Sequence, residues 1–300
     1  MARFLGVDAG GTKTAFVLID EDGTTLAEAT GPTLYAFPAD ASLIRRVLTD
    51  GLAEAGIDPA AVDRAFFALP GYGESSRDLA VLESVPGEVL GHDRYSVGND
   101  MVAGWAGSLG GADGINVVAG TGSIAYGEWR GRTARAGGWS ETFGDEGSGY
   151  WTAIRGLNAF SRMSDGRAPR GPLHARILEA VDSPTDLDVI GTVMGEWAGD
   201  RTRIAALSRV VVAAAEAGDP AAAAIVTEAG AQLAGLVHAV RASLAVEGVL
   251  PVSYSGGMFA APSVLAAFTA ALGDGYALVE PQHGPAFGAA LVAQRHVVSS

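Results

Sequence analysis

The sequence predicts an α/β protein made of two lobes that repeat one architecture. Three short strands open each half of the chain, and in each half a glycine-rich turn joins the first strand to the second. These turns are residues 8–14 (DAGGTKT) and residues 119–123 (AGTGS). Residue identity between the halves is slight, so the repeat is one of element order.

In the first half, the alternation of apolar and polar residues predicts strands at residues 4–7, 14–19 and 25–30. Asp22 and Gly23 lie between the second and third strands and are typical of a hairpin turn. Apolar residues at helical spacing predict a helix at 41–55. A buried strand at 65–69, a short helix at 77–84 and a strand at 95–97 follow, and Asp100 opens a further helix.

The second half begins with strands at 115–118, 123–128 and 133–136. Residues 147–246 are mostly helical, with alanine-rich helices at 204–217 and 221–243 that Gly218, Asp219 and Pro220 separate. Strands at 252–255 and 277–279 and a final helix at 285–295 complete the chain. We expect a small N-terminal lobe of residues 1–110, joined by the C-terminal helix 286–300, and a larger lobe of residues 111–285 with helical insertions.

Composition excludes several classes of protein. A hydrophobic content of 48% in 300 residues is enough for a large core. The net charge of −14 argues against nucleic acid as a partner, because nucleic-acid binding normally needs a basic stripe. The absence of cysteine excludes disulfides, thiolate zinc sites and cysteine-ligated iron–sulfur clusters. No pair of histidines and carboxylates has metal-ligand spacing, and no serine-hydrolase elbow occurs.

The expected location is the cytoplasm. Residues 1–20 read as two strands around a glycine turn, which is unlike a signal or transit peptide. Charged residues bracket the apolar segments, so no run approaches the roughly 18 residues needed to span a bilayer. We therefore expect a soluble protein with no membrane partner.

The two glycine turns predict an anion site. Turns of this kind present backbone N–H groups beside hydroxyls and form concave nests for anions, so two of them could hold a polyphosphate. Neither turn fits the Walker pattern. Gly10 and Gly11 allow the backbone to approach phosphates, and Thr12, Lys13 and Thr14 supply donors. Two plainer alternatives stay open: Lys13, the only lysine in the chain, is a solvated hairpin side chain, and residues 120–123 form an ordinary β-turn.

Motifs along the whole chain resemble those of a known superfold. They are LGVDAGGTKT at 5–14, ND at 99–100, VAGTGS at 118–123, GGW at 137–139, GDEGSG at 144–149, SGGMF at 255–259 and GPAFGAA at 284–290. In this order they resemble the sugar kinase, Hsp70 and actin superfold, and within it the N-acetylglucosamine kinase and BadF/BcrA ATPase family. The resemblance implies a two-lobed actin-like ATPase fold (a duplicated ribonuclease H-like fold) with its active site in the interlobe cleft. It also implies ATP and Mg²⁺ as cofactors and a possible homodimer.

The resemblance implies roles for two carboxylates. Asp8 orients the nucleotide's magnesium, which needs few protein ligands because it keeps several waters; the alternative is that Asp8 only caps the turn. Asp100 is the general base that accepts the proton of the sugar hydroxyl during phosphoryl transfer. The alternative for Asn99 or Asp100 is a plain helix N-cap.

The nucleotide-binding residues follow from the same motifs. Thr121, Gly122 and Ser123 form the second phosphate turn. Gly256 and Gly257 resemble an adenosine-binding turn, in which missing side chains leave room for the purine or ribose. Met258 either flanks the base or is a core methionine.

Residues 137–151 are the most unusual stretch, because glycines, aromatics and three carboxylates in fifteen residues are costly to pack as a core. We interpret it as a ligand-lining loop that includes Gly138 and Trp139. The resemblance implies that Asp145 binds sugar hydroxyls, together with Asn99, Asp100 and Thr121.

Glu141 lies where related kinases are less polar, and an extra carboxylate favours a cationic amine over an acetamide. The resulting hypothesis is ATP-dependent phosphorylation of glucosamine at its 6-hydroxyl. The alternatives are an N-acetylglucosamine kinase, with Glu141 facing solvent, and an ATPase or sugar sensor of the BadF type. The activating ATPases that bridge a dimer with a cysteine-ligated cluster are disfavoured because the chain has no cysteine.

Overall fold

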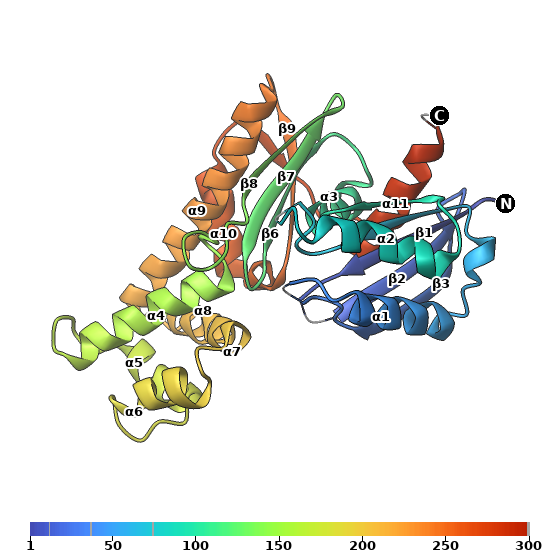
Figure 1. Cartoon of the computed structure of the whole chain (residues 1–300). Helices are drawn as coiled ribbons and strands as arrows, with labels where there is room; N and C mark the ends of the chain where they lie inside the picture. Colours follow the sequence, from blue (N-terminus) through green and yellow to red (C-terminus); the bar gives the residue numbers. More distant parts are fainter. Residues whose placement is uncertain (12, 37, 74, 299–300) are drawn as a thin grey trace. The chain divides into compact units, whose positions relative to one another are not determined.

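The chain folds around two five-stranded sheets with helices packed on them, which confirms the α/β class (Figure 1). The computed structural model describes residues 1–11, 13–36, 38–73 and 75–298. One unit consists of Met1–Asp113 with Glu280–Ser300, and the other of Gly114–Val279. Each unit has its own buried apolar core.

The sheet of the first unit has the strand order β3-β2-β1-β4-β5. Its strands are β1 (Arg3–Ala9), β2 (Lys13–Asp20), β3 (Thr25–Pro32), β4 (Arg64–Ala68) and β5 (Tyr95–Gly98). The first three form an antiparallel meander, and β1, β4 and β5 run parallel. Parallel strands need crossover connections, which α1 (Ala41–Glu54), with the short η1 (Pro59–Ala61), and α2 (Leu79–Leu90) supply.

Helix α2 corrects one expectation. The sequence predicts a short helix at 77–84, but α2 continues through Pro86 to Leu90 and ends at Gly91, whose φ is 70°. Its side chains at Leu82, Val85 and Leu90 are buried in the core of the first unit. Their packing offsets the cost of a proline inside the helix.

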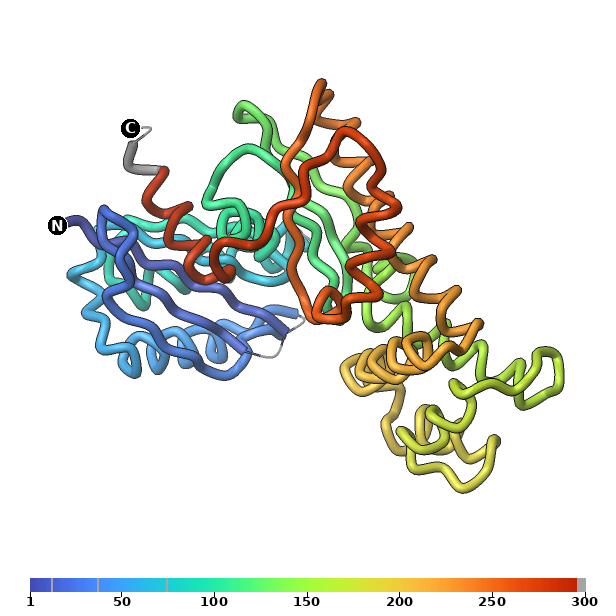
Figure 2. Tube along the Cα trace, turned by 180° about the vertical axis from the view of Figure 1, so that it is seen from behind, coloured from blue at the N-terminus to red at the C-terminus, as the bar shows by residue number. Residues whose placement is uncertain are grey.

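The C-terminal helix α11 (Pro285–Val298) packs on β1 and on α3 (Asp100–Leu109), so the two ends of the chain belong to one unit (Figure 2). Two glycines permit this close approach. A Cβ at Gly6 would lie 2.2 Å from the Ala286 oxygen, and one at Gly288 would lie 2.1 Å from the Ala103 oxygen. These two glycines of the sequence motifs therefore serve backbone packing.

The second unit repeats the first, as expected. Its sheet has the order β8-β7-β6-β9-β10, with an antiparallel meander followed by parallel strands. The strands are β6 (Gly114–Ala119), β7 (Ser123–Trp129), β8 (Arg132–Gly137), β9 (Leu250–Ser255) and β10 (Tyr276–Leu278). Helix α10 (Pro262–Leu272) and the 3₁₀ turn η3 (Gly257–Ala260), which the sequence reading did not foresee, follow β9.

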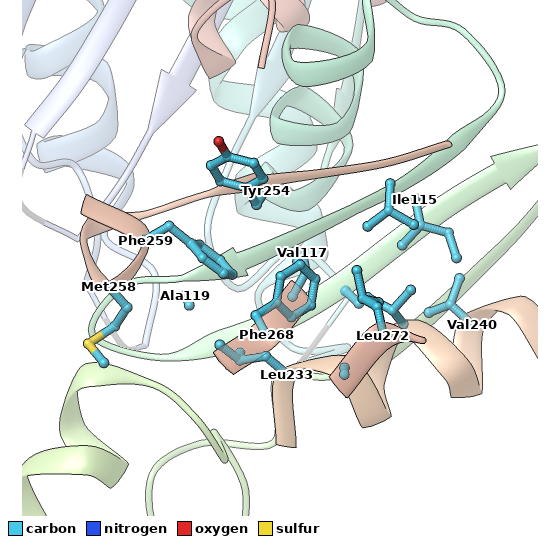
Figure 3. Close-up of a cluster of buried hydrophobic side chains, with 14 of the residues drawn as sticks. Ile115, Val117, Ala119, Leu233, Val240, Tyr254, Met258, Phe259, Phe268 and Leu272 are labelled. Atoms are coloured by element: carbon cyan, nitrogen blue, oxygen red, sulfur yellow. The ribbon is translucent and has the colours of Figure 1, made fainter. Parts of the chain in front are cut away.

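Helix α9 (Pro220–Leu244) carries much of the core of the second unit. Figure 3 shows Leu233 of α9 near Phe268 of α10 and Val117 of β6, and Val240 of α9 near Leu272 of α10 and Ile115 of β6. By length and composition α9 is apolar enough to cross a membrane, which corrects the expectation that no run approaches this length. Ten of its residues are buried against the sheet and its neighbouring helices, as in the core helix of a globular domain.

A helical segment of the second unit has a smaller apolar core of its own. It comprises α4 (Gly149–Ser164), α5 (Pro172–Ala180), α6 (Asp188–Ile190), the π-helix η2 (Gly191–Glu196), α7 (Arg201–Ala206) and α8 (Ser208–Glu216). The single helix expected at 204–217 is thus two helices that meet at Leu207. The Asp200 carboxylate accepts the Arg203 N–H at 2.7 Å and sets the start of α7.

Candidate active site

Two carboxylates of the first unit gather at the same edge of its sheet. Asp8 lies near the end of β1, and Asp100 begins α3 directly after β5. Because β1, β4 and β5 are parallel, their carboxyl ends share this edge. Burial and then the negative charge of Asp100 raise the pKa of Asp8 from 3.8 to about 7, while Lys13 acts in the opposite direction.

Asn99 is the cap of α3. Its side-chain oxygen accepts the Met101 N–H at 3.2 Å, and its amide donates to the Tyr72 carbonyl at 3.1 Å. The side chain is buried and both of its ends are engaged. The capping alternative therefore applies to Asn99, whereas Asp100 is the first helical residue.

The environment of Asp8 fits a divalent cation. Its half-buried carboxylate lies close enough to a second carboxylate to be affected by its charge, and a cation beside it would relieve both the burial and the repulsion. Among the described residues there is no cluster of three acidic, histidine or cysteine ligands. Magnesium does not require one, because it keeps much of its water.

The first glycine turn is partly described. Gly10 donates its N–H to the Lys13 carbonyl at 2.8 Å, and Thr33 donates its hydroxyl to the Gly10 carbonyl at 2.8 Å. Gly11 borders open space, and the Lys13 side chain is exposed. The Thr14 side chain is fully buried in β2, so its hydroxyl does not face the surface. Thr12 lies outside the described residues.

The second glycine turn is braced by α4. The Gly149 and Tyr150 N–H groups, in the first turn of α4, donate to the carbonyls of Gly120 and Thr121 at 2.8 and 3.2 Å. Gly120 donates in turn to the Gly122 carbonyl at 2.9 Å. The N-terminus of α4 thus binds two carbonyls of the turn. A plain β-turn needs no such contact with a helix.

The 137–151 loop is tied to this turn. The buried Ser123 hydroxyl donates to the Glu146 carbonyl at 2.7 Å, and the Ser123 N–H donates to the Asp145 carboxylate. Asp145 is 3% exposed and has a φ of 57°, in the left-handed region. Burial raises the pKa of Asp145 in spite of the opposing charge of Arg201.

Arg201 is the residue that sequence reasoning missed. One of its terminal nitrogens donates to Asp145 Oδ2 at 2.7 Å, and its Nε lies 3.1 Å from Glu141 Oε2. A Cβ at Gly122 would lie 2.8 Å from Arg201 and 2.7 Å from Asp145, so this glycine makes room for the pair. Arg201 is 56 residues from Asp145 in sequence and belongs to no motif, so no local signal marked it.

Glu141 does not simply face solvent. Its side chain is 27% exposed, lies against Arg201, and accepts a hydrogen bond from the Ser140 hydroxyl at 3.0 Å. Its charge is therefore already partnered. Two aromatic side chains of the loop, Trp139 and Phe143, are 62% and 72% exposed, and the Arg135 guanidinium lies over the Trp139 ring at 5.8 Å. Gly138, the neighbour of Trp139, has a φ of 70°.

The two glycines of the turn after β9 have different surroundings. Gly256 has a φ of 98°, and a Cβ there would lie 2.5 Å from the backbone of Ala119, so this glycine is required by packing of β9 on β6. Gly257 borders open space. Met258 is 6% exposed and its side chain belongs to the core, as in the second of the two alternatives above (Figure 3).

Comparison with known proteins establishes the family. Residues 5–293 match the model of the BadF/BadG/BcrA/BcrD ATPase family, and the chain belongs to this family, as its motifs indicated. An N-acetyl-D-glucosamine kinase of Dictyostelium discoideum is 28% identical over 270 residues, covering 85% of this chain and 84% of that protein. An N-acetylmuramic acid/N-acetylglucosamine kinase of Clostridium acetobutylicum is 30% identical over 245 residues, with 80% and 79% coverage.

Solved structures agree with the fold. A Chromobacterium violaceum protein provisionally named an N-acetylglucosamine kinase superimposes with a TM-score of 0.73 at 28% identity, covering 98% of this chain and 99% of that one. A ROK family glucokinase from Streptomyces griseus, in complex with glucose and AMPPNP, has a TM-score of 0.60 at 19% identity and covers 98% and 99%. The two-lobed sugar kinase and actin-like fold expected from the motifs is thus confirmed.

Proposed function

We propose that this protein is an ATP-dependent amino-sugar kinase and that N-acetylglucosamine, phosphorylated at its 6-hydroxyl, is its substrate. The observation that carries the proposal is the pairing of Asp8 and Asp100 at one sheet edge of a chain that belongs to this ATPase family. The similar kinases of Dictyostelium discoideum and Clostridium acetobutylicum are both named for N-acetylated amino sugars.

In this proposal Asp100 is the general base. Phosphoryl transfer depends mainly on positioning and charge stabilisation, and one carboxylate must accept the hydroxyl proton as the new bond to phosphorus forms. Because Asn99 caps α3, the Asp100 carboxylate is not needed for capping. Asp8 holds the nucleotide's Mg²⁺, which neutralises charge on the phosphates when bound.

The phosphates are assigned to the glycine turns. In the first unit, Gly10 and Gly11 leave the backbone approachable and Lys13 offers a cation on an exposed side chain. In the second unit, the carbonyls of Gly120 and Thr121 are bound to α4, which orients the turn as a unit. Gly257, with open space beside it, is assigned to the adenosine moiety.

The choice of sugar depends on Glu141. The expectation of free glucosamine rested on Glu141 as an extra carboxylate near the sugar, but Arg201 lies against that carboxylate. A partnered carboxylate attracts an ammonium group less, so the acetylated sugar becomes the first candidate. Glucosamine is the second candidate, because Glu141 and Asp145 are two carboxylates that share the single guanidinium of Arg201.

The test is coupled ADP release from the purified protein with ATP and Mg²⁺, comparing N-acetylglucosamine, glucosamine and glucose. Asp100→Asn should abolish turnover, and Asp93→Asn, which changes an exposed carboxylate just before β5, should not. Turnover chiefly on glucosamine would transfer the assignment to the second candidate. ADP release that no sugar stimulates would contradict a kinase and favour the ATPase alternative.

A further inference from the structure

We infer that Arg201 is a positioning residue that determines sugar specificity: it neutralises Glu141, orients Asp145, and so makes the site select an uncharged N-acylated amino sugar over a free cationic amine. This inference rests on the proposed function. It concerns three side chains of the second unit that come from two segments, the 137–151 loop and the start of α7.

The geometry shows one cation shared by two anions. Arg201 makes a short charge-assisted hydrogen bond to Asp145 at 2.7 Å, while its contact with Glu141 at 3.1 Å lacks hydrogen-bond alignment at Nε. Asp145 is therefore held in one orientation, and Glu141 is held mainly by charge. The two carboxylates also act on each other, because the charge of Glu141 raises the pKa of Asp145.

The three side chains of this cluster differ in how much of their surface is exposed. The Asp145 side chain is 4% exposed and that of Glu141 is 27% exposed, but the Arg201 side chain is 40% exposed. The Arg201 side chain is therefore the member of the cluster most accessible to a ligand. Guanidinium N–H groups bind hydroxyl and carbonyl oxygens and repel an ammonium group.

The neighbours of the cluster suit a sugar. A Cβ at Gly122 of the phosphate turn would lie 2.7 Å from Asp145 and 2.8 Å from Arg201, so the ion pair lies directly beside that turn. The exposed Trp139 ring in the same loop offers an apolar face on which the C–H groups of a pyranose can stack. The ion cluster thus lies in contact with the phosphate turn, within the loop that carries this aromatic surface.

Removal of Arg201 would expose both carboxylates. Without a cation beside Glu141 and Asp145, an ammonium group would gain a partner and an acetamide would gain none, so preference should move toward glucosamine. Lysine keeps the positive charge without the planar fork and should restore most of the selectivity. Glu141→Gln in the Arg201→Gln background should reverse part of the change, because it removes one of the two exposed charges.

The experiment measures equilibrium binding of N-acetylglucosamine and of glucosamine by titration calorimetry, and kcat/KM for each sugar. We expect Arg201→Gln to lower the ratio of N-acetylglucosamine to glucosamine by at least about tenfold, equivalent to about 1.4 kcal/mol, with KM for ATP changed less than about twofold. Arg203→Gln, two residues along α7, is the matched control and should leave the ratio unchanged.

A purely structural role would weaken binding of both sugars equally, and an unchanged ratio in Arg201→Gln overturns the inference. Should Arg201→Gln fail to fold, Glu141→Gln alone decides, since it leaves Arg201 in place: the ratio must rise, and a fall or no change overturns the inference. Wild-type protein that binds N-acetylglucosamine selectively but transfers no phosphoryl group contradicts the proposed function alone. Binding of neither sugar contradicts both.

Discussion

Asp219 binds the backbone of Leu173, 46 residues earlier in the chain, through an N–H to Oδ2 hydrogen bond of 2.8 Å. The other carboxylate oxygen caps α9 by accepting the N–H groups of Ala221 and Ala222 at 3.0 Å each. Asp219 is fully buried, so one carboxylate ties the start of α5 to the start of α9. The same side chain fills the space beside Gly171.

Asp219→Ala should lower the free energy of unfolding by roughly 2–4 kcal/mol, because it leaves three backbone N–H groups without their acceptor. Urea denaturation followed by circular dichroism measures this loss. Asp40→Ala, which removes the exposed cap of α1, is the comparison and should cost less. Equal losses would show that the link to Leu173 contributes nothing.

Stability should depend on pH through Asp8. Its pKa is about 7 in the folded protein and ordinarily 3.8, so between about pH 4 and 7 the folded state binds more protons than the unfolded state. The free energy of unfolding contributed by this group therefore falls as the pH rises through that window. With a chelator present, the urea midpoint should be lower at pH 8 than at pH 5, and Asp8→Asn should reduce that difference. A slope that is the same in Asp8→Asn and wild type would contradict this assignment.

Magnesium should act on the same carboxylate. At pH 8, where Asp8 is mostly ionised, added Mg²⁺ should raise the urea midpoint of the wild type, because a ligand of the folded state alone stabilises it. Asp8→Asn should show little of this gain, and Asp93→Asn should retain it. Equal stabilisation of all three proteins would place the cation elsewhere.

Gly6→Ala should be strongly destabilising. The added Cβ would lie 2.2 Å from backbone atoms of Ala286 and Ala290, so β1 and α11 would have to separate, at a cost of more than about 3 kcal/mol. Gly235→Ala in α9 is the matched control, since a Cβ there meets nothing within 4 Å and alanine favours a helix. Thermal denaturation distinguishes the two. A Gly6→Ala protein as stable as the wild type would refute the close packing of α11.

Asp100→Asn should lower kcat with little effect on stability, whereas Asn99→Ala should lower stability. Loss of a general base should lower kcat by about 10²–10⁴-fold with little change in stability. Loss of the α3 cap should instead cost about 1 kcal/mol of stability, as measured by urea denaturation. Retention of kcat in Asp100→Asn would remove Asp100 from the chemistry, whatever happens to Asn99.

Local patterns predicted most elements because their signals lie within a few residues. The hairpin between β2 and β3 and the helices α1 and α9 were expected nearly as they occur. Helix α2 was predicted too short, because only burial of Val85 and Leu90 reveals why a proline is tolerated. The break at Leu207 and the helix α10 were missed, since alanine-rich and apolar stretches do not mark where packing interrupts a helix.

The sequence by itself determined the repeated α/β architecture, the two glycine turns and the family, because strand periodicity and turn chemistry are local properties of the chain. Only the tertiary structure decided that Asn99 caps α3, that Met258 lies in the core, and that Gly256 serves packing. It also brought Arg201 to Glu141 and Asp145. A charge pair between distant segments leaves no periodic signal, because it depends on how helices and loops pack after the chain has folded.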